Sequence, residues 1–391
     1  MFGRCLTIGK ICDIILKIYI VFCLHRLLGF WRCATGDCNV GEPIRGRGVS
    51  RNLLNRFDEI EYVDDYEHAD PEPHAPNTQF IPDASKSIIS RNDSPDVGFN
   101  TSVNPYRGCE HGCCYCFARP THEYLGMSAG LDFETKIMVK ERAPTLLREE
   151  LHHPSWTPQV LLLSGVTDPY QPVEKRLRIT RGCLEVLRDY RNPVAIITKN
   201  RLVTRDADLL QEMAGYGAAA VFVSVTTLNL SLNRILEPRS SSPKQRLRAI
   251  QTLAEAGVPV GAMIAPVIPG LTDSEIPAIL EAVADHGGQF AGFIVLRLPW
   301  AVAPLFERWL DEHAPEKKDK VLNRVRALRG GKLYKSEWGT RMKGEGPFAE
   351  QIRALFEVAS VKYGIARGAP TLSTAAFRRP DRRGDQLSLF G

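Results

Sequence analysis

The sequence has no long uncharged hydrophobic run. Its most apolar stretch, residues 11–31, is interrupted by Asp13, Lys17, His25 and Arg26, and the longest charge-free part, residues 18–24, is seven residues long. A helix needs about 20 apolar residues to span a bilayer, so we expect no stable membrane insertion. Two interpretations of residues 1–48 stay open: a segment that does not belong to the native protein, or an interfacial helix.

The sequence also has little excess charge of either sign. Lys and Arg number 50 against 45 Asp and Glu, which leaves a net charge of +5. This sum gives no argument for nucleic acid binding, which depends on a clustered basic face. The hydrophobic fraction of 44% and the charged fraction of 24% exclude wholesale disorder. Residues 52–76 are acidic and rich in proline, and we expect residues 1–80 to be a largely disordered N-terminal segment and arm.

Cysteine is scarce over most of the chain. After Cys116 there is one more cysteine, Cys183, which we expect to be buried packing. Of the other nine, five lie in the first 38 residues and four lie close together at positions 109, 113, 114 and 116. A disulfide framework would spread its cysteines over the folded domain, so this distribution argues against one. It favours a cytoplasmic, reducing location and a metal site.

Short apolar runs alternate with amphipathic segments of helical period. The expected strands are residues 97–103, 160–163, 194–198, 220–225, 258–264 and 290–296. The expected helices are residues 134–151, 174–190, 205–213, 243–255 and 273–284. This α/β alternation predicts a partial (β/α)6 TIM-type barrel over residues 81–300, a C-terminal helical extension over 301–365, and flexible tails. Functional residues of such barrels lie where the strands end.

The first of these strand ends carries the cysteines Cys109, Cys113, Cys114 and Cys116. Thiolates are soft ligands that suit zinc or iron-sulfur clusters. A structural zinc site requires a fourth ligand, for which His111 and His122 are the candidates, whereas a reactive four-iron cluster leaves one iron open. The spacing alone keeps both kinds of site open.

The loop resembles that of the radical S-adenosylmethionine (SAM) superfamily. The resemblance rests on Cys109-x3-Cys113-x2-Cys116 with Tyr115 before the last cysteine, and covers about residues 95–300. It implies that these three cysteines bind a 4Fe-4S cluster whose open iron binds SAM. It also implies an electron donor such as flavodoxin or ferredoxin, and a 5'-deoxyadenosyl radical that abstracts hydrogen from a substrate that the resemblance does not name. Cys114 matches no ligand position.

Within that superfamily, the sequence is similar to the spore photoproduct lyase-like branch. Photoproduct lyases carry a hydrogen-donating cysteine after the second strand, where this chain has Gly165, Val166 and Thr167, so photoproduct lyase activity is not expected. Residues 118–124 resemble an uncharacterised bacterial group of the superfamily, which supplies no reaction. Within them, Arg119, His122 and Tyr124 either contact substrate or hold the cluster loop.

The resemblance also implies a set of SAM-binding residues at successive strand ends. It places Ser164, Thr167 and Asp168 near the amino group of SAM, Lys199 at its carboxylate, and Ser224 and Thr226 at the ribose. Glu237, Arg239 and Arg246 follow, and residues 265–273 resemble the bend that accepts adenine. Each residue has an ordinary alternative, such as a surface lysine or a helix-face cation, and their order along the chain is what favours the site. No catalytic residue is predicted.

The C-terminus carries a separate motif. We expect residues 366–391 to be a disordered tail that ends in a motif for the replication sliding clamp, Gln386, Leu387, Ser388, Leu389 and Phe390. Arginines at 378, 379, 382 and 383 suit a tail close to DNA. Two functions therefore remain: a radical SAM enzyme acting on a DNA-associated substrate, or a non-catalytic metal-binding adaptor that docks on the clamp.

Overall fold

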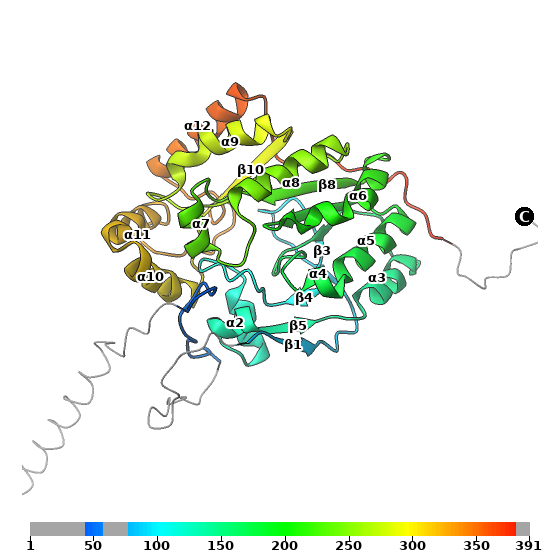
Figure 1. Ribbon diagram of the computed structural model, residues 1–391, viewed down its shortest axis with the longest axis horizontal. Helices are drawn as coiled ribbons and strands as arrows, with labels where there is room; N and C mark the ends of the chain where they lie inside the picture. The colour runs from blue at the N-terminus through cyan, green and yellow to red at the C-terminus, as the bar shows by residue number, and fades with distance from the viewer. Residues whose placement is uncertain (1–43, 58–76, 381–391) are drawn as a thin grey trace, which may run out of the picture. The chain divides into compact units, whose positions relative to one another are not determined.

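The computed structural model describes residues 44–57 and 77–380. Six parallel strands form the barrel wall in the order β3-β6-β7-β8-β9-β10, which confirms the predicted partial (β/α)6 barrel (Figure 1). These strands are β3 (Thr101–Val103), β6 (Leu161–Leu163), β7 (Val194–Thr198), β8 (Ala219–Ser224), β9 (Val260–Val267) and β10 (Phe290–Val295). β8 is buried along its whole length, as expected for a parallel strand covered on both faces.

Short strands extend this sheet and build a second one. β2 (Ile89–Arg91) pairs antiparallel with β3, and β11 (Ala366–Arg367) pairs parallel with β10. β1 (Gln79–Pro82), β5 (Lys136–Val139) and β4 (Tyr106–Arg107) form a three-stranded sheet in the order β1-β5-β4. Because β4 directly precedes the cysteines, this small sheet fixes the start of the cysteine loop.

Helices cover the outside of the barrel (Figure 1). They are α2 (Leu131–Thr135), α3 (Ala143–His152), α4 (Glu174–Leu177), α5 (Ile179–Tyr190), α6 (Ala207–Ala214), α7 (Leu230–Leu236), α8 (Pro243–Glu255) and α9 (Ile276–Asp285). The C-terminal extension contains α10 (Val302–His313), α11 (Lys318–Ala327) and α12 (Pro347–Lys362). Among the helices of the described residues, none is long and apolar enough to cross a membrane.

Two expected helices were wrong in detail. Residues 134–151 contain the end of α2, then β5 and most of α3 instead of one helix, because residues 136–139 alternate between half-buried and buried and pair with β1 and β4. The expected helix 174–190 is divided at Arg178, whose φ of 55° is left-handed. Both segments have an amphipathic pattern of helical period, which by itself does not indicate where a helix is interrupted.

Residues 366–380, expected to be disordered, instead pack along the amino end of the barrel. After β11, the Ser373 amide donates to the Gly217 carbonyl 2.8 Å away, before β8. Phe377 then packs against Tyr190, and the Arg378 amide donates to the Tyr190 carbonyl, before β7. The segment thus passes the starts of successive strands, opposite the end that carries the cysteines. The predicted clamp motif, residues 386–390, lies outside the described residues.

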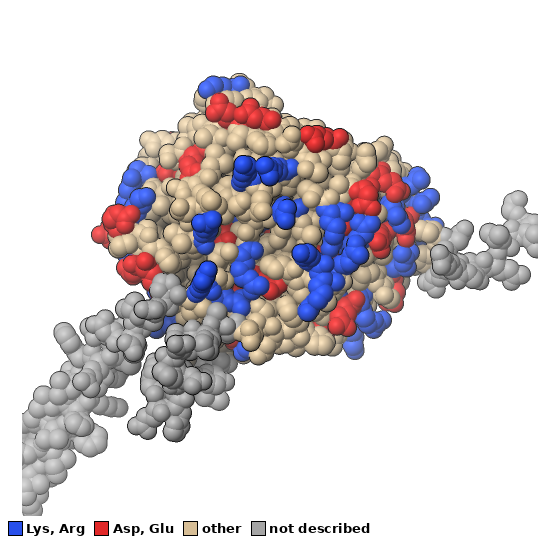
Figure 2. Space-filling model, in the orientation of Figure 1, with Lys and Arg blue, Asp and Glu red and all other residues tan. Residues whose placement is uncertain are grey.

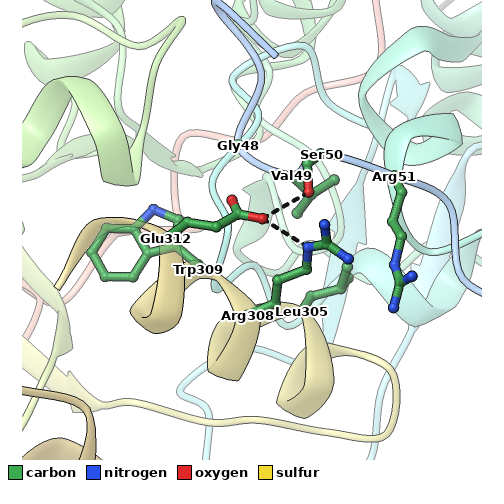
Figure 3. Close-up of a pocket in the computed structure, with 8 residues that line it drawn as sticks. All are labelled: Gly48, Val49, Ser50, Arg51, Leu305, Arg308, Trp309 and Glu312. Carbon is green, nitrogen blue, oxygen red and sulfur yellow. Dashed lines mark hydrogen bonds and ion pairs between the residues drawn. The ribbon is translucent and has the colours of Figure 1, made fainter. Parts of the chain in front are cut away.

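Residues 44–57, expected to belong to a disordered arm, also pack on the barrel. Figure 3 shows the small pocket where they meet α10, in which Glu312 accepts hydrogen bonds from Ser50 Oγ at 3.0 Å and Arg308 Nε at 2.7 Å. Gly48 lies so close to the cysteine loop that a Cβ there would be 1.5 Å from the Gly112 carbonyl oxygen. This segment therefore forms one wall of the cysteine loop.

Candidate functional site

The cysteine loop leaves the barrel at the carboxyl end of β3, through β4. Gly108 begins it at φ 80°, where a Cβ would meet the His122 ring at 2.8 Å and the Phe133 carbonyl oxygen at 2.9 Å. The next amide, that of Cys109, donates to the same Phe133 carbonyl at 2.9 Å. The close packing explains why glycine precedes the first cysteine.

The three expected ligands come together in this loop. Cys116 packs against the two apolar clusters that contain Cys109 and Cys113. Burial raises the pKa of all three thiols, and the neighbouring Cys113 and Cys116 thiols further raise that of Cys109. Because the thiolate is the ligand form, metal binding here must displace protons.

The donor set fits a polynuclear centre. In the part of the chain that the structure describes, no three His, Cys, Asp or Glu side chains form a group able to hold one metal ion. A mononuclear zinc site requires such a group, whereas in a four-iron cluster each cysteine binds a different iron. His111, one alternative zinc ligand, has both ring nitrogens engaged, Nε2 with Asn200 and Nδ1 with Asp168. His122, the other, lies 2.9 Å from the Lys136 carbonyl oxygen through Nε2, and its buried Nδ1 has no hydrogen-bond partner among the described residues.

Arg119 stabilises the cysteine loop through four polar contacts. Its fully buried guanidinium donates to the Cys113 carbonyl at 3.0 Å and to the carbonyls of Ala129 and Gly130 at 3.2 and 2.9 Å, and forms a short ion pair with Glu134. Burial opposes the charge, but Glu134 outweighs it and raises the pKa of Arg119. These contacts assign Arg119 to holding the loop instead of contacting substrate.

His122 and Tyr124 differ from each other. His122 is buried against Phe133, and its Nε2 lies 2.9 Å from the Lys136 carbonyl oxygen, so it also holds the loop. Tyr124 is 69% exposed and packs against Phe57. Of the two, only Tyr124 is available to a ligand from solvent.

A second cluster of predicted residues surrounds the Glu237 carboxylate. Tyr115 and Arg246 form short contacts with it, Thr226 Oγ1 donates to it at 2.7 Å, and Lys199 Nζ lies 3.6 Å away. Burial favours the neutral acid, but Arg246 and Lys199 lower the pKa of Glu237 far below its usual range. Glu237 is therefore a fixed anion that orients the cations and hydroxyls around it.

A third cluster centres on Asp168, in the loop that follows β6. Its carboxylate accepts from Thr198 Oγ1 and from the Tyr170 and Lys199 amides at 2.7–2.8 Å, and lies 3.3 Å from His111 Nδ1. Burial would raise the pKa of Asp168, but His111 and these donors lower it. Asp168 thus joins the cysteine loop to the ends of β6 and β7.

The remaining predicted residues lie around these clusters. Thr167 Oγ1 donates to the Gly108 carbonyl at 2.6 Å, and Ser164 Oγ donates to the Thr167 carbonyl at 3.2 Å. Ser224 is buried, and its carbonyl accepts from Arg246 at 2.9 Å. Arg239 stands apart and forms an ion pair with Glu110 at 3.0 Å. Tyr115, Lys199, Thr226 and Arg246 thus surround the Glu237 carboxylate, while Arg239 contacts the cysteine loop through Glu110.

Sequence reasoning missed three polar side chains that organise the loop. Glu110 accepts from the Val173 amide at 2.7 Å, Gln171 Nε2 donates to Thr167 Oγ1 at 3.1 Å, and Glu134 accepts from the Gly48 amide at 3.0 Å. Glu110 lies between the cysteines, and this position was the one available signal. Gln171 and Glu134 stand in ordinary surroundings, and their roles depend on contacts distant in the sequence.

Comparison with known proteins supports the resemblance. Residues 103–283 match the Radical SAM superfamily. An uncharacterised protein of Mycobacterium tuberculosis (strain ATCC 25618 / H37Rv) is 38% identical over 232 residues, which cover 59% of this chain and 67% of that protein. An uncharacterised protein of Methanocaldococcus jannaschii is 28% identical over 224 residues, which cover 57% of this chain and 80% of that protein.

Solved structures resemble the barrel. A mutant of spore photoproduct lyase has a TM-score of 0.54 and 15% identity, over 74% of this chain and 81% of that chain. Spore photoproduct lyase complexed with dinucleoside spore photoproduct gives 0.53 and 15%, with the same coverage. At this identity the likeness shows the fold, a partial TIM barrel.

Proposed function

The chain belongs to the radical SAM superfamily, whose enzymes use a 4Fe-4S cluster and SAM, and we propose that Cys109, Cys113 and Cys116 hold that cluster. One observation carries this assignment. The three thiols share the carboxyl end of the barrel with Lys199 and Glu237, and both of these charges act on the pKa of Cys113. The proposed ligand thiols and the lysine that follows β7 thus lie at the same end of the barrel.

When bound, the cluster and SAM supply one-electron cleavage of SAM and a 5'-deoxyadenosyl radical, which abstracts hydrogen from the substrate. The chain's own residues bind and orient. Lys199 Nζ, held 3.0 Å from the Ala265 carbonyl oxygen and 5.8 Å from the centre of the Tyr115 ring, is the proposed partner of the SAM carboxylate. Arg246 is fully buried, so its part is to position Glu237 and the end of β8. Ser164, Thr167, Asp168, Ser224 and Thr226 are proposed to shape the rest of the SAM site.

The adjacent cysteines Cys113 and Cys114 provide a matched test. Both are buried, but the proposal makes Cys113 a ligand and gives Cys114 no ligand role. After anaerobic reconstitution, Cys113→Ala should lose most of its iron and its 5'-deoxyadenosine formation with SAM and reductant, and Cys114→Ala should keep both. Equal iron content in the two variants would contradict the assignment. An intact wild-type cluster without 5'-deoxyadenosine would contradict the enzymatic proposal.

We further propose a DNA or DNA-associated substrate. On the face shown in Figure 2, Lys and Arg side chains gather around the middle, while Asp and Glu lie mostly toward the edges. Such a face attracts polyanions. The structurally similar spore photoproduct lyase was solved with a dinucleoside photoproduct, but this chain has Gly165, Val166 and Thr167 after β6, so we propose a different reaction for it.

Two partners and a location follow from the same proposal. Flavodoxin or ferredoxin would supply the electron in a reducing, cytoplasmic setting, which agrees with the absence of a disulfide among the five cysteines that the structure describes. The C-terminal residues 386–390 would bind the sliding clamp, and their support is the sequence motif. Deleting residues 386–391 should abolish clamp binding in a pull-down with purified clamp and leave iron content unchanged. Undiminished clamp binding would refute the role of the motif.

A further inference from the structure

Exposed aromatic rings and arginines form a connected surface at the mouth of the barrel. We define this mouth surface by Arg56, Phe57, Phe117, Tyr124, Arg297, Trp300 and Tyr334, and we include the buried Arg329, whose charge interacts with that of Arg297. Four of its rings, Phe57, Phe117, Tyr124 and Trp300, are between 47% and 69% exposed. Large rings are normally buried on folding, so a gathering of exposed ones indicates a binding surface.

Ring and cation contacts connect one part of the mouth surface to the next. The Arg56 guanidinium lies 4.3 Å from the centre of the Trp300 ring, 4.7 Å from that of Phe57 and 5.4 Å from that of Tyr124. The rings of Trp300 and Tyr334 lie 5.9 Å apart. Arg56 therefore joins rings from three separate segments of the chain into one platform.

The platform continues to the cysteine loop. Arg297 lies 5.2 Å from the centre of the Phe117 ring, and Phe117 directly follows Cys116. Arg297 and Trp300 lie just after β10, whose carboxyl end faces the same side of the barrel as that of β3. A ligand on this surface would thus lie beside the proposed cluster.

Arg56 of the mouth surface forms an ion pair with Glu123 at 3.1 Å, whereas its other two arginines, Arg297 and Arg329, lack a carboxylate partner among the described residues. Arg329 is 1% exposed and donates to the Leu296 carbonyl at 3.0 Å and the Thr340 carbonyl at 2.9 Å. Within the described ranges neither it nor Arg297 has a carboxylate at ion-pair distance, and the Nε of each is buried without a hydrogen-bond partner. Buried cations are normally paired, so this pair favours an anionic ligand.

The backbone at Trp300 gives a supporting observation. Its φ of 44° is left-handed, a conformation that bulky residues rarely adopt. An indole that stays exposed at a strained position adds little to folding stability, because it neither buries apolar area nor relieves the strain. Such positions cluster at ligand sites.

We propose that the mouth surface binds single-stranded nucleic acid. Unpaired bases stack on Trp300, Tyr124 and Phe57, while a backbone phosphate pairs with Arg297, whose charge Arg329 reinforces. A duplex keeps its bases stacked inside and cannot offer them to these rings. The proposal deepens the proposed function by naming the substrate class, yet binding requires neither cluster nor SAM.

The test measures fluorescence anisotropy of a labelled oligothymidylate of about twelve nucleotides with the full chain. Trp300→Ala should weaken binding by about tenfold or more, because a stacked base is lost. Arg297→Gln should weaken binding and reduce the slope of log affinity against log salt by about 0.7, the value for one phosphate on a single strand.

A second exposed pair of the same kind serves as the matched control. Arg324 of α11 lies 5.4 Å from the centre of the exposed Phe348 ring of α12, outside the mouth surface. Phe348→Ala and Arg324→Gln should leave affinity unchanged, which would support the proposal together with the losses at Trp300 and Arg297.

Three outcomes would overturn it. They are equal losses in the control variants, tighter binding of a duplex of the same length, and equally tight binding of polyglutamate, which would show that charge alone determines affinity. If the full chain does not bind the oligonucleotide in this way, the proposed radical SAM function is still tested separately by iron content and 5'-deoxyadenosine formation.

Discussion

Replacing Arg119 tests whether the cysteine loop depends on a buried ion pair. Arg119→Met keeps much of the side-chain volume but leaves the Glu134 carboxylate and the Cys113 carbonyl without their donor. Removing one partner of a buried pair costs about 3–5 kcal/mol. Because the total stability of a domain is about 5–15 kcal/mol, this loss is a large share.

The assay is urea unfolding of the purified apoprotein, followed by iron and sulfide analysis after reconstitution. We expect the free energy of unfolding to fall by about 3–5 kcal/mol and the iron content to drop, since the Cys113 carbonyl loses its donor. Arg324→Met, which removes a half-exposed ion pair with Asp273, is the control and should cost at most about 1 kcal/mol.

Two further variants separate charge from geometry. Arg119→Lys keeps a cation near Glu134 but cannot reach four acceptors at once, so stability should recover more than iron content. In Arg119→Met combined with Glu134→Gln, no uncompensated buried charge remains and the new side-chain amide oxygen can still accept from the Gly48 amide, so stability should partly recover. The reasoning is refuted if Arg119→Met unfolds like the Arg324→Met control and binds iron normally.

Three other perturbations follow from the same structure. Gly48→Ala should displace the cysteine loop and lower the iron content, whereas Gly98→Ala, where the added Cβ meets open space, should do neither. Equal iron content in the two variants would show that residues 44–57 do not support the cysteine loop. Folding lowers the pKa of Glu237, so its contribution to stability is present above the unfolded pKa of about 4.3 and is lost as the pH falls below it. The difference in unfolding free energy between wild type and Glu237→Gln should therefore shrink between about pH 5 and pH 3. A difference that stays constant over this range would contradict the proposed network. Lys199→Met should weaken SAM binding to the reconstituted protein by about tenfold or more, and Lys199→Arg should partly restore it. Unchanged affinity in calorimetry would show that Lys199 does not contact SAM.

The barrel was predictable because its signals are local. The helix expected at residues 243–255 coincides with α8, where Ser242 and Gln245 form a capping box and Pro243 occupies the first turn. The strands β7 and β8 match their apolar runs closely, since a parallel strand with both faces covered is apolar along its length, and β8 is buried at every residue.

The errors arose where distant partners decide the structure. Residues 136–139 are a strand because they pair with residues 79–82, more than fifty positions earlier, and no local period records that pairing. Residues 366–380 are polar, yet their backbone groups find acceptors at Gly217 and Tyr190. Composition describes what a segment can bury by itself, and these segments are held by hydrogen bonds to the barrel.

The site shows the same division between local and distant signals. The cysteine spacing and the order of strand ends are enough to propose Cys109, Cys113 and Cys116 as ligands and Lys199 as a SAM contact, because these signals lie in short stretches of sequence. Whether Arg119 touched substrate or the loop could not be decided from its neighbours, since the deciding partner is Glu134, fifteen positions away on α2. The role of a side chain that positions other groups can be recognised only from the folded structure, because its hydrogen-bond partners lie elsewhere in the sequence.

The two ends of the barrel carry separate tasks. The carboxyl end holds the cysteine loop, Lys199 and the mouth surface, whereas residues 366–380 follow the amino end, so the chain reaches position 380 on the side opposite the proposed chemistry. If the proposed clamp motif and the proposed mouth surface both bind their partners, the two contacts use different residues of the chain. Substitutions in the mouth surface should then leave clamp binding unchanged, and deletion of residues 386–391 should leave oligonucleotide binding unchanged.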